Sequence, residues 1–150
     1  SLGDGGIHGR TNQAAVGCNL NPFSFMMGGQ SVRVPNPVTW SIMKLVAMRD
    51  QRVVSENPGN SVESRGFALS QAQKHAQDVC RIVAMTTRDE SEDVASVVHA
   101  IRKTAAFVSA ADIFGRFFRN DDAWGVRAVG SLWNRGDFQT LRSVLSSWLG

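Results

Sequence analysis

Two cysteines and three histidines are the side chains in this sequence that could carry out nucleophilic or metal chemistry. A thiol beside an imidazole can act as a nucleophile, but Cys18 and Cys80 form no CxxC pair and no zinc-ligand spacing with His8, His75 or His99. We therefore expect no metal, no cofactor and no thiol dyad. Cys80 lies beside the row of apolar residues that recurs at helical spacing from Leu69 to Thr86, which we call the seam. We therefore expect Cys80 to be a buried packing residue. The two cysteines could be bridged if the protein is secreted, or both could be free.

Two other segments contain residue types used in catalysis or phosphate binding. Acids gather in TTRDESED, residues 86–93, at the start of a predicted helix with no histidine nearby; favourable interaction with the helix dipole explains them better than a paired-carboxylate active site. The stretch GDGGIHG, residues 3–9, lacks the GK[ST] ending of a phosphate loop. We therefore predict that the protein is not an enzyme. A site assembled from distant residues is the third alternative.

Arginine is far more frequent than lysine: of the basic residues, 13 are arginine and only 3 are lysine. The net charge is +3. Arginine forms planar, forked hydrogen bonds to phosphate or carboxylate, which suits nucleic-acid contacts or subunit interfaces. A GC-rich coding sequence would give the same bias.

The last third of the chain interleaves arginine with aromatic residues, a composition found in nucleic-acid sites and in protein interfaces. The alternative is that most of these aromatics form the core. Four nearby acids nearly balance the arginines, so we expect some Arg–Asp pairs. The residues are Arg116, Arg119, Arg127, Arg135, Arg142, Phe114, Phe117, Phe118, Trp124, Trp133, Phe138, Trp148, Asp112, Asp121, Asp122 and Asp137.

Hydrophobic periodicity predicts helices throughout residues 37–150. Asn36 is the expected N-cap of the first helix, with Pro37 at its first position. A third helix is expected to continue to Val108. The spacing of Ser109 and Asp112 is that of a capping box, so either a new helix or a bent continuation is expected to follow. Asp137 is expected to cap the last helix. The residues expected to be buried on the first three helices are Val38, Ile42, Leu45, Val46, Leu69, Ala72, Ala76, Val79, Val83, Thr86, Val94, Val97, Ile101, Ala105 and Val108.

These patterns predict an all-α protein with one domain, residues 37–150, folded as an irregular bundle of four to six helices. A long arm, residues 1–36, precedes it. The first 37 residues contain seven glycines and three prolines, and only SVRV, residues 31–34, has an extended pattern. Fixing such a backbone costs about 1–2 kcal/mol per residue, and the arm has few apolar side chains to bury. We therefore expect it to pack mainly on a neighbouring copy through Phe23, Phe25, Met26 and Met27.

The leading functional prediction is a self-assembling structural subunit, a viral coat or nucleocapsid-type protein that contacts RNA or DNA phosphates. The alternative is a helical protein-interaction module, an adaptor or secreted effector, without a nucleic-acid role. The sequence shows no 18-residue apolar run and no signal-peptide pattern, so we expect no membrane span. A virion or the cytoplasm is favoured, with secretion left open. The predicted phosphate-contacting residues are Arg33, Arg102, Lys103, Arg116 and Arg119.

Overall fold

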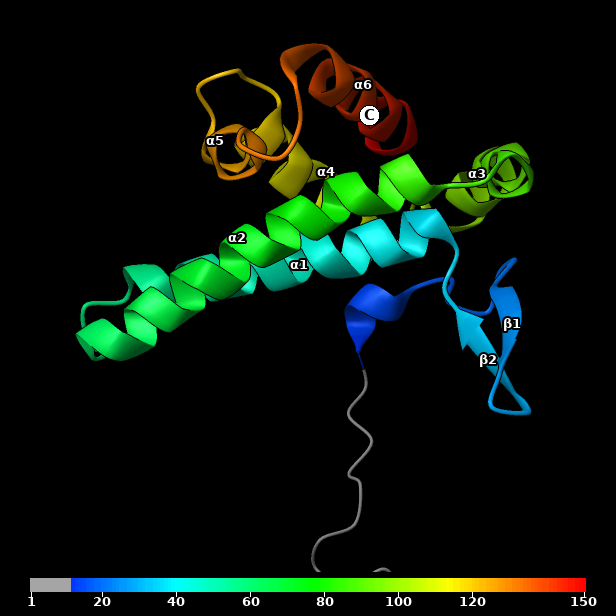
Figure 1. The fold of residues 1–150 in the computed structure, drawn as a ribbon, viewed down its shortest axis with the longest axis horizontal. Coiled ribbons are helices and arrows are strands. Elements are labelled where there is room, and N and C mark those ends of the chain that lie inside the picture. The colour runs from blue at the N-terminus through cyan, green and yellow to red at the C-terminus, as the bar shows by residue number, and fades with distance from the viewer. Residues whose placement is uncertain (1–11) are drawn as a thin grey trace, which may run out of the picture.

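The computed structural model describes residues 12–150, and its described part is mostly helical, as predicted (Figure 1). The predictions for GDGGIHG and His8 lie outside the described residues. In chain order the elements are η1 (Gln13–Ala15), β1 (Phe23–Met27), β2 (Gln30–Val34), α1 (Pro37–Glu56), α2 (Val62–Met85), α3 (Arg88–Ile101), α4 (Ala105–Phe118), α5 (Trp124–Val129) and α6 (Arg135–Leu149).

Asn36 caps α1 as predicted and also anchors the chain that precedes it. Its Oδ1 accepts a 2.9 Å hydrogen bond from the Thr39 backbone N–H. Its Nδ2 donates to the carbonyl oxygens of Gly17 at 3.0 Å and Leu20 at 2.9 Å. The Thr39 hydroxyl donates to the Val16 carbonyl at 2.7 Å. The side chain of Asn36 thus pairs three backbone groups that would otherwise need water.

The segment 12–20 packs on its own helices, so the prediction that the whole arm packs mainly on another copy is wrong for these residues. Ala14 is buried, and Val16 and Leu20 pack against the core. Gly17 has φ of +71°, and a Cβ there would lie 3.0 Å from Ile101 Cγ2. Glycine is required at this position because the backbone is left-handed and closely packed.

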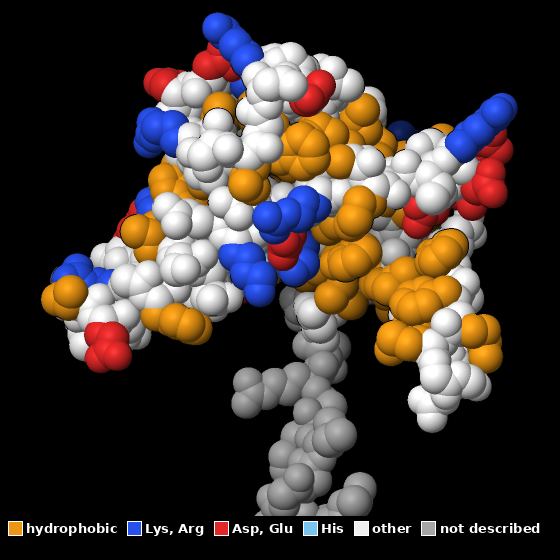
Figure 2. All heavy atoms as spheres, viewed as in Figure 1, with side chains coloured by type: hydrophobic (Ala, Val, Ile, Leu, Met, Phe, Trp, Pro, Cys, Tyr) orange, Lys and Arg blue, Asp and Glu red, His pale blue; other side chains and the backbone are white. Residues whose placement is uncertain are grey.

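Helices α1 and α2 form an antiparallel pair along the long axis of the molecule (Figure 1). The predicted α2 seam is confirmed at Ala72, Ala76, Val79 and Val83, which are buried; the small alanines let the helices approach closely. Lys44 Nζ lies 2.8 Å from Asp78 Oδ2 and ties the pair together. Over the middle of these helices, Lys and Arg side chains gather around an acidic one (Figure 2).

The predicted third helix is two helices, α3 and α4. A capping box of Thr87 and Glu90 starts α3, which ends at Ile101. The Thr104 hydroxyl accepts from the Phe107 N–H and caps α4, so the turn between the helices changes the phase of the apolar pattern. Ala105 and Val108 are therefore exposed, whereas the prediction buried them.

The predicted caps near the C-terminus also need correction. Asn134, not Asp137, caps α6: its Oδ1 accepts from the Asp137 N–H at 2.8 Å.

The short helix α5 packs so closely on α4 that a Cβ at Gly125 would lie 2.5 Å from the Phe117 carbonyl oxygen. Gly125 is thus a packing requirement, although glycine inside a helix is by itself unfavourable.

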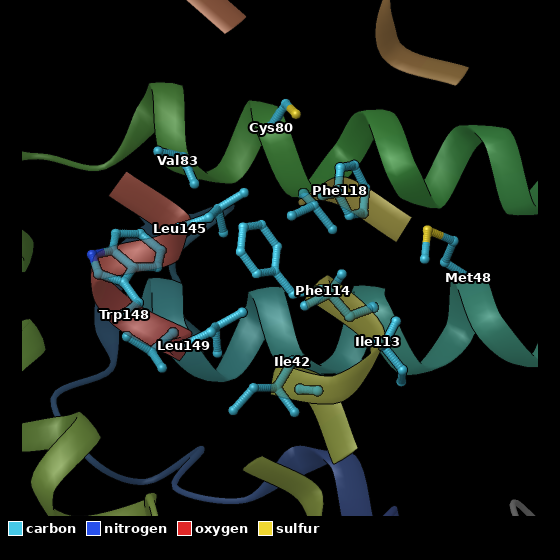
Figure 3. Close-up of a cluster of buried hydrophobic side chains, with 14 of the residues drawn as sticks. Ile42, Met48, Cys80, Val83, Ile113, Phe114, Phe118, Leu145, Trp148 and Leu149 are labelled. Carbon is cyan, nitrogen blue, oxygen red and sulfur yellow. The ribbon is translucent and has the colours of Figure 1, made fainter. Parts of the chain in front are cut away.

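The core lies where α1, α2, α4 and α6 meet (Figure 3). Phe114 and Phe118 stack with ring centroids 5.9 Å apart. Of the C-terminal aromatics, Phe114, Phe117, Phe118, Phe138 and Trp148 are buried and Trp124 and Trp133 are half-buried. The core interpretation of these aromatics is therefore the one that the structure supports.

We predict that Asn36→Asp will lower the free energy of unfolding by about 3 kcal/mol. The carboxylate can still accept from Thr39, but it cannot donate to the carbonyls of Gly17 and Leu20, and each buried unpaired group costs about 1–3 kcal/mol. Ser61→Ala, which removes the exposed cap of α2, is the control and should cost about 1 kcal/mol. Urea unfolding measures both, and equal losses would contradict the anchoring role.

We predict that a bulky thiol reagent will label Cys18 within minutes and Cys80 orders of magnitude more slowly in the native protein. Cys18 is exposed, whereas Cys80 is fully buried and burial raises the pKa of its thiol to about 12, so little reactive thiolate exists. Both should react rapidly in guanidinium chloride. Equal native rates would show that Cys80 is not a packing residue.

Candidate assembly interface

An antiparallel hairpin, β1 and β2, lies within the arm, where the sequence indicated an extended pattern only at residues 31–34. Phe23 pairs with Val34, Phe25 with Val32 and Met27 with Gln30. Gly28 and Gly29 form the turn with φ of +56° and +78°, the left-handed geometry of a tight two-residue hairpin turn. The signal was present in the sequence, because two five-residue runs flank a Gly-Gly pair.

The four residues predicted to form the subunit interface all lie on β1 and are all exposed, from 38% for Phe25 to 68% for Met26. Side chains alternate between the two faces of a strand, so Phe23, Phe25 and Met27 share one face and Met26 lies on the other. The rings of Phe23 and Phe25 stack with centroids 6.1 Å apart. Val32 and Val34 of β2 extend this apolar face.

The hairpin projects from the helical bundle and receives little support from it (Figure 1). Its sheet has only two strands within residues 12–150, so both edges carry unpaired backbone groups. An isolated two-stranded hairpin is marginally stable in water. Figure 2 shows hydrophobic side chains gathered over the hairpin and the helix ends next to it. The arrangement is therefore suited to docking on another protein surface.

An open groove of about 560 Å³ separates the base of the hairpin from the start of α3. Phe23 forms one wall, and Asp89, Glu90 and Asp93 contribute three carboxylates on the other. Glu90 is held by its hydrogen bonds to Thr87, whereas Asp89 and Asp93 form no ion pair within the described chain. The hairpin end of the molecule thus combines an apolar face with negative charge.

The five predicted phosphate-contacting residues are exposed, and none forms an ion pair within residues 12–150. Arg33 lies on the polar face of the hairpin opposite Ser24. Arg102 and Lys103 lie in the turn after α3, not on the polar face of a longer helix as the sequence suggested.

Arg116 and Arg119 lie at the C-terminal end of α4. The guanidinium of Arg116 lies 5.2 Å from the Phe117 ring centroid, and no ion pair joins it to Asp112, one turn earlier in the same helix. Arg119 Nη2 lies 3.5 Å from the Gly150 carbonyl oxygen. At about 1.5 Å per residue, α4 separates Lys103 from Arg116 by about 20 Å. The five cations therefore do not converge on one phosphate; they could contact only an extended polyanion.

Arg142, which is not among the predicted phosphate contacts, is half-buried and bound to groups of its own chain. Its Nη2 lies 2.7 Å from Asp121 Oδ1, and its Nη1 donates to the carbonyl oxygens of Phe118 and Arg119. Hydrogen bonds from Arg142 lower the pKa of the Asp121 carboxyl. The expected Arg–Asp pairing in this region is confirmed here.

Helices α1 and α2 share a cluster of charges that the sequence pattern does not indicate. Lys44 and Arg81 both pair with Asp78, at 2.8 and 3.0 Å. Burial tends to raise the pKa of Asp78, but the hydrogen bonds from Lys44 and Arg81 outweigh it and lower the pKa. Burial, followed by repulsion from Lys44, lowers the pKa of His75. Asp78 neutralises one of the two positive charges of Lys44 and Arg81, and its ion pair with Lys44 joins α2 to α1.

Potential metal ligands do not gather in the described part of the chain. Cys18 and Cys80 are free, and residues 12–150 contain no group of three potential metal ligands. No helix within this range has the length and apolar character that a bilayer span requires. The chain matches no known family model, no curated protein and no solved structure.

Proposed function

We propose that this chain is a self-assembling structural subunit, of coat or nucleocapsid type, whose copies are joined through the β1–β2 hairpin. The observation that carries the proposal is the exposed apolar face of a hairpin that its own helices do not cover. Long unpaired strands with apolar side chains promote association unless they are covered. A partner surface would supply the support that the two strands lack alone.

Nucleic-acid binding is the second part of the proposal. Exposed arginines without acidic partners keep their charge available for phosphate contacts. Two pairs of these cations, Arg102 with Lys103 and Arg116 with Arg119, lie at opposite ends of α4, a spacing that suits an extended phosphate backbone. The buried C-terminal aromatics leave few rings for base stacking. Binding is therefore expected to be electrostatic and independent of sequence.

The alternative is an interaction module whose hairpin docks on a different protein. The same exposed face would serve this function, so the oligomeric state of the purified chain distinguishes the two proposals. An adaptor or effector domain of this kind is a monomer or a dimer and does not form larger assemblies as its concentration rises.

We predict that the wild-type chain will assemble with rising concentration and that Phe23→Ser/Phe25→Ser will remain monomeric. Sedimentation velocity measures this, and the helical circular dichroism should not change because neither residue lies in a helix. Val108→Ser/Leu132→Ser is the control, since it removes two other exposed apolar side chains, 51% and 45% accessible. It should assemble like the wild type.

Two results would contradict this prediction. A wild-type chain that is monomeric at all concentrations would overturn self-assembly and favour the interaction module. Assembly of the Phe23→Ser/Phe25→Ser variant at the wild-type concentration would exclude the hairpin as the joining element.

We predict salt-sensitive binding to a fluorescent 20-nucleotide polyuridine strand and to a random duplex of the same length. The log–log slope against salt should fall by about 1.4 to 1.8 for Arg102→Gln/Lys103→Gln, and equally for Arg116→Gln/Arg119→Gln, because each variant removes two contacts worth about 0.7–0.9. Arg88→Gln/Arg135→Gln is the control: both arginines are exposed but lie beside acids. Its slope should match the wild type. Salt-independent binding, or none, would contradict the nucleic-acid role.

A further inference from the structure

The outer edge of β1 carries backbone groups that its own chain leaves unpaired. In a hairpin with a two-residue turn, the residues that flank the turn, here Met27 and Gln30, form a hydrogen-bonded pair. Hydrogen-bonded and non-hydrogen-bonded pairs alternate along an antiparallel ladder, so the N–H and C=O groups of Ser24 and Met26 point away from β2. No backbone hydrogen bond joins residues 21–35 to the rest of the described chain. Strand β1 therefore presents an open edge at these two residues.

This edge is accessible. Ser24 and Met26 are both exposed, and no described helix packs extensively on β1. The hairpin extends away from the bundle, with its turn at the far end (Figure 1). At the base of the hairpin, the open groove of about 560 Å³ is lined by Asn21, Pro22 and Phe23 and by no residue of β2, so it lies beside β1. A strand that pairs with β1 therefore finds space along the edge and at its base.

The two edges of the hairpin differ in charge. Strand β1, FSFMM, has no charged residue, whereas β2 contains Arg33. By the same alternation the outward-facing residues of β2 are Ser31 and Arg33, so pairing β2 with another β2 would place two arginines as diagonal neighbours on one face. Charged side chains protect a strand edge from pairing in this way. The edge of β1 has neither such a charge nor a proline within the strand.

The edge of β1 is complementary to itself. When two copies of β1 lie antiparallel about a two-fold axis at Phe25, Ser24 of each copy is opposite Met26 of the other. These are the outward-facing residues, so each such pair exchanges both of its hydrogen bonds. Residues that lie opposite one another share a face of the sheet, so Phe25 meets Phe25, and Phe23 meets Met27. One register thus pairs the backbone groups and joins the apolar faces.

We propose that two copies of the chain join through their β1 edges in this register and form one continuous sheet, in the order β2–β1–β1–β2. The proposal deepens the proposed function and rests on it. Two strands alone are marginally stable in water, whereas three or more strands with an apolar face can be stable. Pairing therefore supplies the support that each hairpin lacks. The apolar side chains of both copies lie on one face of the joined sheet, which leaves a larger apolar surface for contacts with further copies.

The groove at the hairpin base fits this arrangement. Because Met27 of the second copy lies opposite Phe23, the Gly-Gly turn that follows it extends alongside Asn21 and Pro22, which line the groove. A turn of two glycines has no side chains, so it can enter a confined space. The carboxylates on the other wall of the groove can accept hydrogen bonds from the unpaired N–H groups of that turn.

Cysteine cross-linking tests the register. In a Cys18→Ser background, which leaves only the buried Cys80, Phe25→Cys places two thiols opposite each other across the axis. The Cα atoms of such a non-hydrogen-bonded pair are about 4.5 Å apart, which a disulfide can span. Val32→Cys is the matched control, because Val32 pairs with Phe25 within the hairpin. In the joined sheet the two Val32 residues lie three strand spacings apart, about 14 Å.

Mild oxidation should convert most of the Phe25→Cys protein to a covalent dimer and roughly 10-fold less of the Val32→Cys protein, measured by non-reducing electrophoresis. Cross-linking of Val32→Cys alone would show that copies join through β2, and equal cross-linking of both would show contact through the apolar faces. Cross-linking of neither, in chains that still assemble, would exclude the hairpin edge. In these three cases the edge pairing is wrong while self-assembly stands. A wild-type chain that never assembles overturns the pairing together with the proposed function.

A pair of proline variants provides a second test without new thiols. Met26→Pro removes an N–H group from the outer edge of β1, and Ser31→Pro removes the corresponding group of β2, because Met26 and Ser31 are opposite in the hairpin. The ladder between the two strands uses neither group. Met26→Pro should raise the concentration needed for assembly by roughly 10-fold or more, since each copy loses a hydrogen bond across the axis.

Ser31→Pro is the control for the backbone change, and Met26→Ser is the control for the lost side chain. Both should assemble close to the wild-type concentration, measured by sedimentation velocity. If Met26→Pro assembles like the wild type, or if Ser31→Pro weakens assembly equally, pairing through the β1 edge is overturned.

Discussion

The hydrogen bonds of Asn36 fix the junction on which the placement of the N-terminal segments depends. This nearly buried amide uses its oxygen to start α1 and its nitrogen to hold the carbonyls of Gly17 and Leu20. Without such a donor, the folded segment before the hairpin would bury unpaired carbonyl groups, which is costly. Because both stems of the hairpin meet here, the strands leave the bundle in one direction and remain clear of the helices.

The core combines small residues, where helix backbones approach closely, with aromatic residues that fill the space between the helices. Alanines on α2 and Gly125 on α5 bring neighbouring helices near, and the large rings of α4 and α6 fill the remaining space. Protein interiors are packed this densely because voids lose dispersion contacts. The consequence is that the arginine-aromatic mixture of the last third separates, with most rings inside and most guanidinium groups outside.

The proposed function follows from what this packing leaves uncovered. Lys44, Arg81 and Arg142 pair with acids of the same chain, whereas the five predicted phosphate contacts have no acidic partner within residues 12–150. The hairpin exposes apolar side chains that the described helices leave uncovered. In the proposed assembly, a second copy of the chain covers them.

The sequence by itself determined the helical class, the Asn36–Pro37 start of α1 and the buried seam of α2, because caps and helical periodicity are local properties. It also indicated the apolar character of residues 23–27. The Gly28–Gly29 turn, the helix break at Thr104 and the cap at Asn134 are also local features. The break was missed because helical periodicity continues across Thr104, and the cap was missed because Asp137 is an equally suitable capping residue. Only the tertiary structure decided that residues 12–20 fold back on α1, that Gly125 is a close contact, and that α4 separates Arg102 and Lys103 from Arg116 and Arg119. Those outcomes depend on which segments meet in space, since the same side chain is core or surface according to the neighbour that covers it.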